Sequence, residues 1–397
     1  MTKSSISHKQ ERSLLHAFFF LFGLGIMAWV PRFPELKAQL GLDNGAFGSL
    51  MSTGAIGAFV GLLITGHVIH KIGIYSVMHA AIAIMLGSLA LIVHIHSSFA
   101  FFFLNICIGF GITTLHVSSN AQAFHLQDRS GASLVTSVSG YWAAGALLTS
   151  IISGIMVGRV VLATHIDILE VICYLGMFSI LLKLRPVLVK ANTNPEMQSK
   201  AIDIFKSFHL DWPVSLAMLG VTYLETCIGD WGTIFTKERL GIHSGLSALP
   251  YTLFLGAMIV VRLSSDKMAA RQPLHYWFSR GTLIAGIGFG GFIAAAVNLP
   301  ESQRKLSYIF IICSFLCAAV GIASLGPNLM RVANRRSPNS SAVVIGQLGA
   351  TNNVLTFITK WAVAWTIQFT SSIAIAMAIP TALILSAYFV AHVTKED

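Results

Sequence analysis

A carboxyl group stands inside an apolar stretch in the second half of the chain. Glu225 follows Tyr223 and Leu224 in a largely uncharged run from 213 to 235. A charged side chain at the centre of a bilayer costs about 2.5–3.5 kcal/mol on insertion scales, so such a group is expected to face a cavity or a partner. We interpret Glu225 as the binding site of a coupling proton or of a polar group of a solute; the alternative is a structural carboxyl hydrogen-bonded to a neighbouring helix. Asp230 points about 140° away on a helix and is expected at the outer helix end.

Lys360 is a basic side chain in a similar apolar setting. Asn353 and Thr356 precede it by seven and four residues, so the three share one helix face. This stripe favours a cavity lining over a lipid-facing surface, although a lysine near a helix end can also reach back to the membrane interface. Asn353 and Lys360 are predicted to bind substrate, and a pair between Glu225 and Lys360 stays open.

A polar stripe also runs along an apolar stretch in the first half, between 99 and 124. Asn105, Gly109, His116 and Asn120 fall within about 60° of one another on a helix. His116 is a second candidate for proton coupling because an imidazole exchanges protons near neutral pH. The alternative is a histidine that is hydrogen-bonded as part of the structure.

Amide and aromatic side chains close to this stripe are suited to a polar solute. Asn120 and Gln122 offer paired donors and acceptors for hydroxyl or amide groups. Tyr141 and Trp142 can stack against a sugar-like ring. We predict that these four residues bind substrate, with interhelical hydrogen bonds and aromatic packing as the alternative.

The sequence gives little support for a metal site, a disulfide framework or an enzyme active site. His67 with His70, and His94 with His96, have metal-like spacing, but no acidic or cysteine residue accompanies them, so solvated loop histidines are expected. The five cysteines lie in apolar runs and are expected to pack rather than to form a disulfide framework. Because the chain has neither a Walker loop nor a hydrolase motif, we expect no enzyme activity, no metal and no cofactor.

The elements that hold these residues are predicted to be membrane-spanning helices. Of the 397 residues, 55% are hydrophobic and 11% are charged, against about 25% charged in soluble domains. A run of roughly 20 apolar residues suffices to cross a bilayer as a helix. Twelve such runs occur, at 13–31, 45–68, 75–95, 99–124, 133–158, 164–184, 213–235, 247–263, 275–298, 306–330, 342–368 and 370–392.

The basic residues lie between these runs. The net charge of +10 is therefore interpreted as a topology signal and not as a nucleic-acid surface. Lys and Arg are more numerous in the segments that place both termini and the middle loop in the cytoplasm. The first run is too long for a signal peptide and lacks a cleavage site, so we expect it to be retained. In the sixth run, Asp167 and Glu170 are expected at the outer membrane interface.

One short motif occurs in both halves. Residues 40–45 read Leu-Gly-Leu-Asp-Asn-Gly, and residues 240–245 read Leu-Gly-Ile-His-Ser-Gly. Such recurrence is typical of transporters built from internal repeats. We predict an N-terminal six-helix bundle at 1–184, a cytoplasmic linker at 185–212 and a C-terminal six-helix bundle at 213–397.

Two loop motifs carry a resemblance to a known family. Residues 66–73 read Gly-His-Val-Ile-His-Lys-Ile-Gly, and residues 262–271 read Arg-Leu-Ser-Ser-Asp-Lys-Met-Ala-Ala-Arg. Together with twelve spans in two halves, they resemble the major facilitator superfamily and its Gly-x-x-x-Asp-Arg/Lys-x-Gly loop. Here His70 stands where aspartate is usual, and Arg262 stands in the glycine position. The resemblance implies an all-α fold of two pseudo-symmetric six-helix bundles, and gating roles for Gly66, His70, Lys71, Gly73, Asp266, Lys267 and Arg271.

Within that family the details resemble bacterial members similar to fucose permease. The residues that carry this are at 29–34, 120–122, 139–145, 225–231 and 326–327. The resemblance implies a monomeric secondary transporter in a bacterial-type inner membrane that moves a small polar organic solute by alternating access, with a proton as the favoured coupling ion. Proton-coupled efflux of amphiphilic compounds and a sensor without transport activity are the alternatives.

Overall fold

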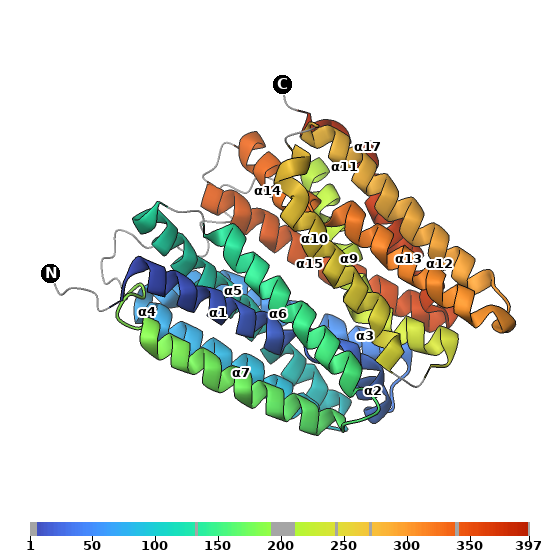
Figure 1. Cartoon of the computed structure of the whole chain (residues 1–397), viewed down its shortest axis with the longest axis horizontal. Helices are drawn as coiled ribbons and strands as arrows, with labels where there is room; N and C mark the ends of the chain where they lie inside the picture. The colour runs from blue at the N-terminus through green and yellow to red at the C-terminus, as the bar shows by residue number, and fades with distance from the viewer. Residues whose placement is uncertain are drawn as a thin grey trace. The chain divides into compact units, whose positions relative to one another are not determined.

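The chain divides into two compact units built from helices. The computed structural model describes residues 6–131, 134–191, 211–242, 245–269, 272–337 and 341–395, and every regular element in these ranges is a helix (Figure 1). Unit 1 comprises residues 1–29, 50–153 and 159–206, and unit 2 comprises 30–49, 154–158 and 207–397. The predicted linker at 185–212 lies largely outside the described residues.

Unit 1 is built from five long helices. They are α1 (His8–Ile26), α4 (Gly54–Ile92), α5 (Ser98–Ser130), α6 (Val135–Met156) and α7 (Leu162–Leu184). The long α4 accounts for two predicted spans because it is bent at Gly73, whose φ of 80° and ψ of 160° are accessible to glycine and not to residues with a side chain.

Unit 2 holds the remaining spans and several short helices. Its first elements are η1 (Val30–Arg32), α2 (Phe33–Gln39) and most of α3 (Asn44–Ser52). The others are α9 (Trp212–Leu240), η3 (Gly245–Ala248), α10 (Leu249–Ala269), α11 (Leu274–Leu283), η4 (Ile284–Gly288), α12 (Phe289–Asn298), η5 (Glu301–Gln303), α13 (Arg304–Ile322), α14 (Leu325–Arg336), α15 (Ser341–Thr370), α16 (Ile373–Ala376), α17 (Ala378–Phe389) and η6 (Ala391–Thr394).

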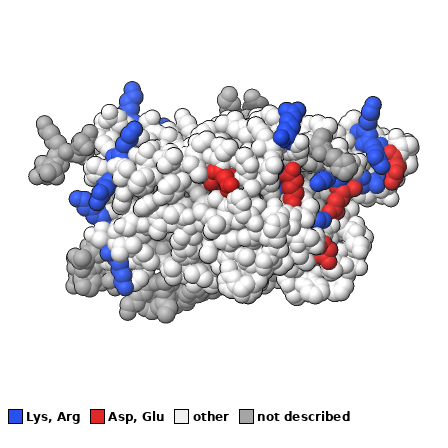
Figure 2. Space-filling view, turned by 90° about the horizontal axis from the view of Figure 1, so that it is seen from below, with Lys and Arg blue, Asp and Glu red and all other residues white. Residues whose placement is uncertain are grey.

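Each of the twelve predicted spans coincides with one of these helices, part of one, or two or three that follow one another in sequence. Within the described residues, eight helical stretches are long and apolar enough to cross a membrane, and α4 with α3 counts as one of them. The helices α9 and α15 are not among the eight, and both carry the charged and amide side chains that the sequence singles out. On the face shown in Figure 2, most of the surface is uncharged, and the basic and acidic side chains form separate small groups.

Small residues let the helices of unit 1 approach closely. A methyl group on Gly57 of α4 would overlap the carbonyl oxygen of Ile106 on α5, and one on Gly109 of α5 would overlap that of Gly54 on α4. Gly23 of α1 stands in the same relation to α6. In lipid, such backbone contact replaces the hydrophobic effect as the source of helix association.

The glycine at the second position of each copy of the repeated motif adopts the same left-handed conformation. Gly41 follows α2 with φ of 63°, and Gly241 caps α9 with φ of 61°. Both are left-handed turns that end a helix, a conformation that glycine adopts without strain. Within unit 2, Lys37 Nζ and Asn44 Nδ2 contact the carboxylate of Glu238 on α9 at 2.5 and 2.9 Å, which helps to explain why residues 30–49 cluster with this unit.

Glu170 of α7 is buried inside the protein, with an exposed fraction of 2%, and its place at the outer membrane interface stays a prediction. It packs beside Gly25 of α1, where the missing side chain leaves room for the carboxyl group. Asp167, three residues earlier, is exposed and accepts from His94 Nε2 at 2.9 Å, so His94 has an acidic partner that its sequence neighbours did not reveal.

Candidate functional site

Glu225 forms an open ion pair within unit 2. Its helix α9 packs against α10, α13, α14, α15 and α17, and buries Tyr223, Leu224 and Cys227 among them. Glu225 projects from a less buried part of α9 and meets Arg262 of α10, whose Nη2 lies 3.4 Å from Oε2 and 3.5 Å from Oε1. The two side chains are 37% and 38% exposed. Charge-assisted hydrogen bonds are normally about 2.7–2.9 Å long, so this pair is loose and accessible.

Arg262 is anchored from its other edge. Its Nε donates to the carbonyl oxygen of Ala323, at the end of α13, at 3.1 Å. The guanidinium therefore contacts both α9 and α13. A planar group with five donors can make both contacts at once.

A second ion pair joins α9 to α15. Asp230 Oδ2 lies 2.8 Å from Lys360 Nζ, and the side chains are only 16% and 17% exposed. The pairing that stayed open is therefore decided: Lys360 pairs with Asp230, and Glu225 pairs with Arg262. Asp230 is part of an interhelical pair rather than the helix-end contact that was expected.

Neutral hydrogen bonds reinforce the contact between α9 and α15. Thr222 Oγ1 lies 2.9 Å from Asn352 Oδ1 and donates to it, and the buried Tyr223 hydroxyl donates to the carbonyl oxygen of Thr359 at 3.2 Å. Asn353, the predicted ligand residue next to Asn352, is half-buried. On α15, Asn352 and the carbonyl oxygen of Thr359 are thus bonded to α9, whereas the neighbouring Asn353 is only half-buried.

In unit 1, His116 lies among aromatic rings. Its ring centroid is 4.6 Å from that of Phe22 on α1 and 5.9 Å from that of Trp142 on α6. Asn120 donates from Nδ2 to the carbonyl oxygen of His116 at 2.9 Å, one turn earlier on α5. The buried indole Nε1 of Trp142 has no hydrogen-bond partner among the described residues. The structure therefore brings three predicted site residues together: His116, Asn120 and Trp142.

Tyr141 takes part in a neighbouring contact. It is 45% exposed, and its ring stacks on His16 of α1 with centroids 4.2 Å apart and planes 11° from parallel. His16 Nε2 lies 2.9 Å from Ser137 Oγ on α6. The sequence did not single out His16, although it lies in an apolar run just as His116 does.

Two polar residues of α5 are already bonded within unit 1. Asn105 is buried and donates from Nδ2 to the carbonyl oxygens of Leu50 and Met51, each at 3.0 Å, and to Thr53 Oγ1 at 3.1 Å. These bonds hold the turn between α3 and α4. Asn105 is therefore a structural residue at this position.

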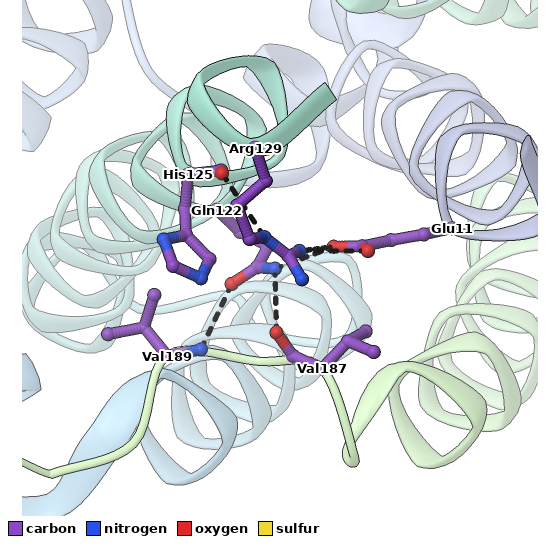
Figure 3. A network of polar contacts seen from close by, with 6 residues as sticks. All are labelled: Glu11, Gln122, His125, Arg129, Val187 and Val189. Atoms are coloured by element: carbon purple, nitrogen blue, oxygen red, sulfur yellow. Dashed lines mark hydrogen bonds and ion pairs between the residues drawn. The ribbon is translucent and has the colours of Figure 1, made fainter. Parts of the chain in front are cut away.

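Gln122 is fully buried in a polar network at the other end of α5 (Figure 3). Its Nε2 donates to Glu11 Oε1 at 2.9 Å and to the carbonyl oxygen of Val187 at 3.2 Å, while its Oε1 accepts from the backbone of Val189 at 3.1 Å. Arg129 Nη2 contacts both oxygens of Glu11, at 2.8 and 2.9 Å. Because its amide is occupied by the protein itself, we do not carry Gln122 forward among the substrate-binding residues.

The predicted gating residues of the first loop lie in or next to the bend of α4. Gly66 faces open space, Lys71 is exposed, and the buried Nε2 of His70 has no hydrogen-bond partner among the described residues. At the bend, the backbone next to Gly73 meets the segment that follows α7, with Ile74 donating to the carbonyl oxygen of Val189 at 3.0 Å.

The second loop is described only in part. Asp266 and Lys267 belong to α10, but their side chains lie outside the described residues, as does all of Arg271. Arg262, assigned from the sequence to the glycine position of this loop, is the partner of Glu225. An arginine at the edge of an apolar run, where a small residue is expected, was the available signal.

The helical architecture agrees with a sequence comparison. The family described as Major Facilitator Superfamily matches residues 15–359. The chain belongs to this superfamily. It is accordingly a multi-pass membrane transporter and not an enzyme, and the predicted fold class is confirmed.

Curated members of the superfamily resemble the chain over most of its length. An uncharacterised MFS-type transporter of Yersinia pestis is 24% identical over 327 residues, which cover 80% of this chain and 79% of the relative. An uncharacterised transporter of Sinorhizobium fredii is 23% identical over 315 residues, covering 78% of each chain.

Solved superfamily structures share the fold. The nucleoside transporter NupG superposes with a TM-score of 0.75 at 14% identity, covering 97% of this chain and all of the other. A D-xylose–proton symporter gives a TM-score of 0.70 at 14% identity, with 96% and 97% covered. At these identities the likeness concerns the fold alone.

Proposed function

We propose that this superfamily member is a secondary active transporter that moves a small polar organic solute, sugar-like or a related metabolite, together with a proton. The observation that supports this most is the open ion pair of Glu225 and Arg262 inside the helices of unit 2. Charged side chains are costly in membrane helices unless they serve a pathway or a partner. A loose pair with both groups more than a third exposed can exchange its partner for a ligand.

The proposed chemistry follows from the two groups. When Glu225 takes up a proton, its neutral carboxyl releases Arg262, and the guanidinium can then bind a hydroxyl, carbonyl or carboxylate group of the solute. When the solute leaves, Arg262 recovers its partner as Glu225 loses the proton. Proton and solute would in this way be bound together and released together.

The other polar groups have distinct proposed roles. The shorter, less exposed pair of Asp230 and Lys360 braces α9 against α15 and keeps Lys360 at the edge of the solute-binding face with Asn353. In unit 1, the ring of Tyr141 and the cluster of His116, Asn120 and Trp142 are proposed to offer a stacking surface and hydrogen bonds to a solute. We further propose that the protein is a monomer in a bacterial-type inner membrane with both termini in the cytoplasm.

Ligand identity is tested first by thermal stabilisation. Purified protein is screened with sugars, amino acids and organic acids at two pH values, because a bound ligand raises the melting temperature. A solute whose shift is larger at the lower pH, and whose shift in Glu225→Gln is kept but no longer depends on pH, would support the proposal. The matched control is Glu301→Gln, which removes a carboxyl group that is 84% exposed and should keep a shift that depends on pH.

Coupling is then tested in proteoliposomes with the solute found in the screen. An inward proton gradient should drive uptake by the unaltered protein, and Glu225→Gln should abolish this uptake while solute exchange at equal pH is retained. Full gradient-driven uptake by Glu225→Gln would refute the role of Glu225. Absence of flux for every stabilising solute would instead point to a sensor.

A further inference from the structure

Unit 1 contains a buried carboxyl group to which the proposed function gives no role. Glu170 of α7 is 2% exposed, and neither of its oxygens has a hydrogen-bond partner among the described residues. If this side chain were ionised, it would carry a full charge that no hydrogen bond from the described residues compensates. Buried carboxyl groups are otherwise paired or hydrogen-bonded, as Glu11 is in the same unit.

The surroundings of Glu170 are apolar on the faces that meet it. The helices α1 and α7 pack side by side, and α4 packs against both (Figure 1). A Cβ placed on Gly25 of α1 would lie 3.3 Å from Glu170 Oε2 and 3.0 Å from Leu86 of α4. The carboxyl group therefore occupies a space that exists because α1 has a glycine there.

The ionisable groups near this space are few. Helix α1 has none after His16, and α4 has none between His79 and Ile92. On α7 itself, Cys173 follows Glu170 by three residues and is buried, and His165 precedes it by five and is largely buried. None of these groups is a fixed positive charge that would hold Glu170 ionised.

A route to water lies one turn away. Asp167 precedes Glu170 by three residues, so the two side chains are neighbours on the surface of the helix. Asp167 and its partner His94 are 39% and 54% exposed. An imidazole bonded to a carboxylate can pass a proton to and from water, and Asp167 of this pair is one helical turn from Glu170.

We propose that Glu170 is a proton-binding site of unit 1, where the carboxylate takes up a proton from water through His94 and Asp167 and returns it by the same route. The ligand is a proton and the product is a neutral carboxylic acid, so no other reactant is needed. An ionised carboxylate in this space would have to gain water or a donor. Release of the proton is therefore tied to loosening of the contact between α1 and α7.

The protonation state of Glu170 can be read without any solute, so the test is independent of the proposed function. Infrared difference spectra of the purified protein, recorded between about pH 5 and about pH 9, where buried glutamates can titrate, should show the carbonyl stretch of a neutral carboxylic acid. The part of the band that is lost in Glu170→Gln belongs to Glu170, and this part should shrink as the pH rises. It should remain in the control Glu301→Gln.

Three results would overturn the proposal. They are a spectrum without the band at any pH, a Glu170 part of the band that stays constant over the whole range, and a band whose intensity is unchanged in Glu170→Gln. Since Glu170→Gln keeps the size of the side chain, it is expected to fold.

Thermal stability provides a second readout. If the folded state keeps the proton and the unfolded state releases it, the folded state binds more protons and becomes less stable as the pH rises. The melting temperature of the unaltered protein should therefore fall relative to that of Glu170→Gln with increasing pH. A difference that does not depend on pH would contradict proton binding at this site.

Discussion

Each unit contains a glutamate paired with an arginine, and the two pairs differ in burial and in distance. In unit 1, Glu11 is fully buried and accepts two short bonds from Arg129 and one from Gln122. In unit 2, Glu225 is more than a third exposed and meets Arg262 only at 3.4 Å or more. A buried pair with every bond made fixes structure, whereas a long and accessible pair leaves its members available to a proton or a ligand. The same chemical groups thus form a buried, fully bonded pair in one unit and a longer, more exposed pair in the other.

The largest effect on stability is expected at Glu11. Glu11→Ala removes an acceptor from Arg129 and from Gln122, whereas Gln122 keeps the carbonyl oxygen of Val187 and Arg129, 32% exposed, can reach solvent. The loss of hydrogen bonds to a buried charged group costs about 2–3 kcal/mol. The free energy of unfolding in detergent, measured by chemical denaturation, should fall by this order. Glu301→Ala, which breaks an exposed pair with Arg304, serves as the control; an equal effect of the two substitutions would remove the contrast between buried and open pairs.

An intermediate effect is expected at the pair between α9 and α15. Asp230 and Lys360 are less exposed than the Glu225 pair and closer together. A double-mutant cycle with Asp230→Asn and Lys360→Met should give a coupling energy of about 1 kcal/mol or more, because residues in direct contact are not additive. If the stability losses of the two single variants add up to that of the double variant, the two side chains do not stabilise each other.

The smallest effect on stability is expected at Glu225. Glu225→Gln should change the free energy of unfolding by less than about 1 kcal/mol, because an exposed ion pair contributes little. The same variant should lose proton-driven transport, so stability and function separate at this residue. A stability loss as large as that of Glu11→Ala would show that Glu225 is a structural carboxyl bonded to a neighbouring helix and not a group that exchanges protons.

The helices of this protein could be predicted from the sequence because a bilayer demands runs of apolar residues with internal hydrogen bonds. The repeated motif was also visible in the sequence, and its Gly41 and Gly241 both adopt a left-handed conformation. These features depend on residues that are near one another in the chain.

The partners of the charged residues could not be predicted in this way. Glu225 was recognised as an intramembrane carboxyl, but its partner Arg262 was assigned to a loop. For Glu170, the sequence did not reveal that the carboxyl group is buried beside Gly25. Which side chains meet across helices depends on the rotation and register of each helix, and a small change in either selects a different partner.

Composition and periodicity alone determined that the chain is a bundle of membrane helices and which residues carry charge within them. The tertiary structure decided that Glu225 faces Arg262, that Asp230 holds Lys360 and that Glu170 is enclosed beside Gly25. The physical reason is that insertion into a membrane is a property of each segment by itself, whereas the cost of a buried charge is set by whichever groups its neighbours bring to it.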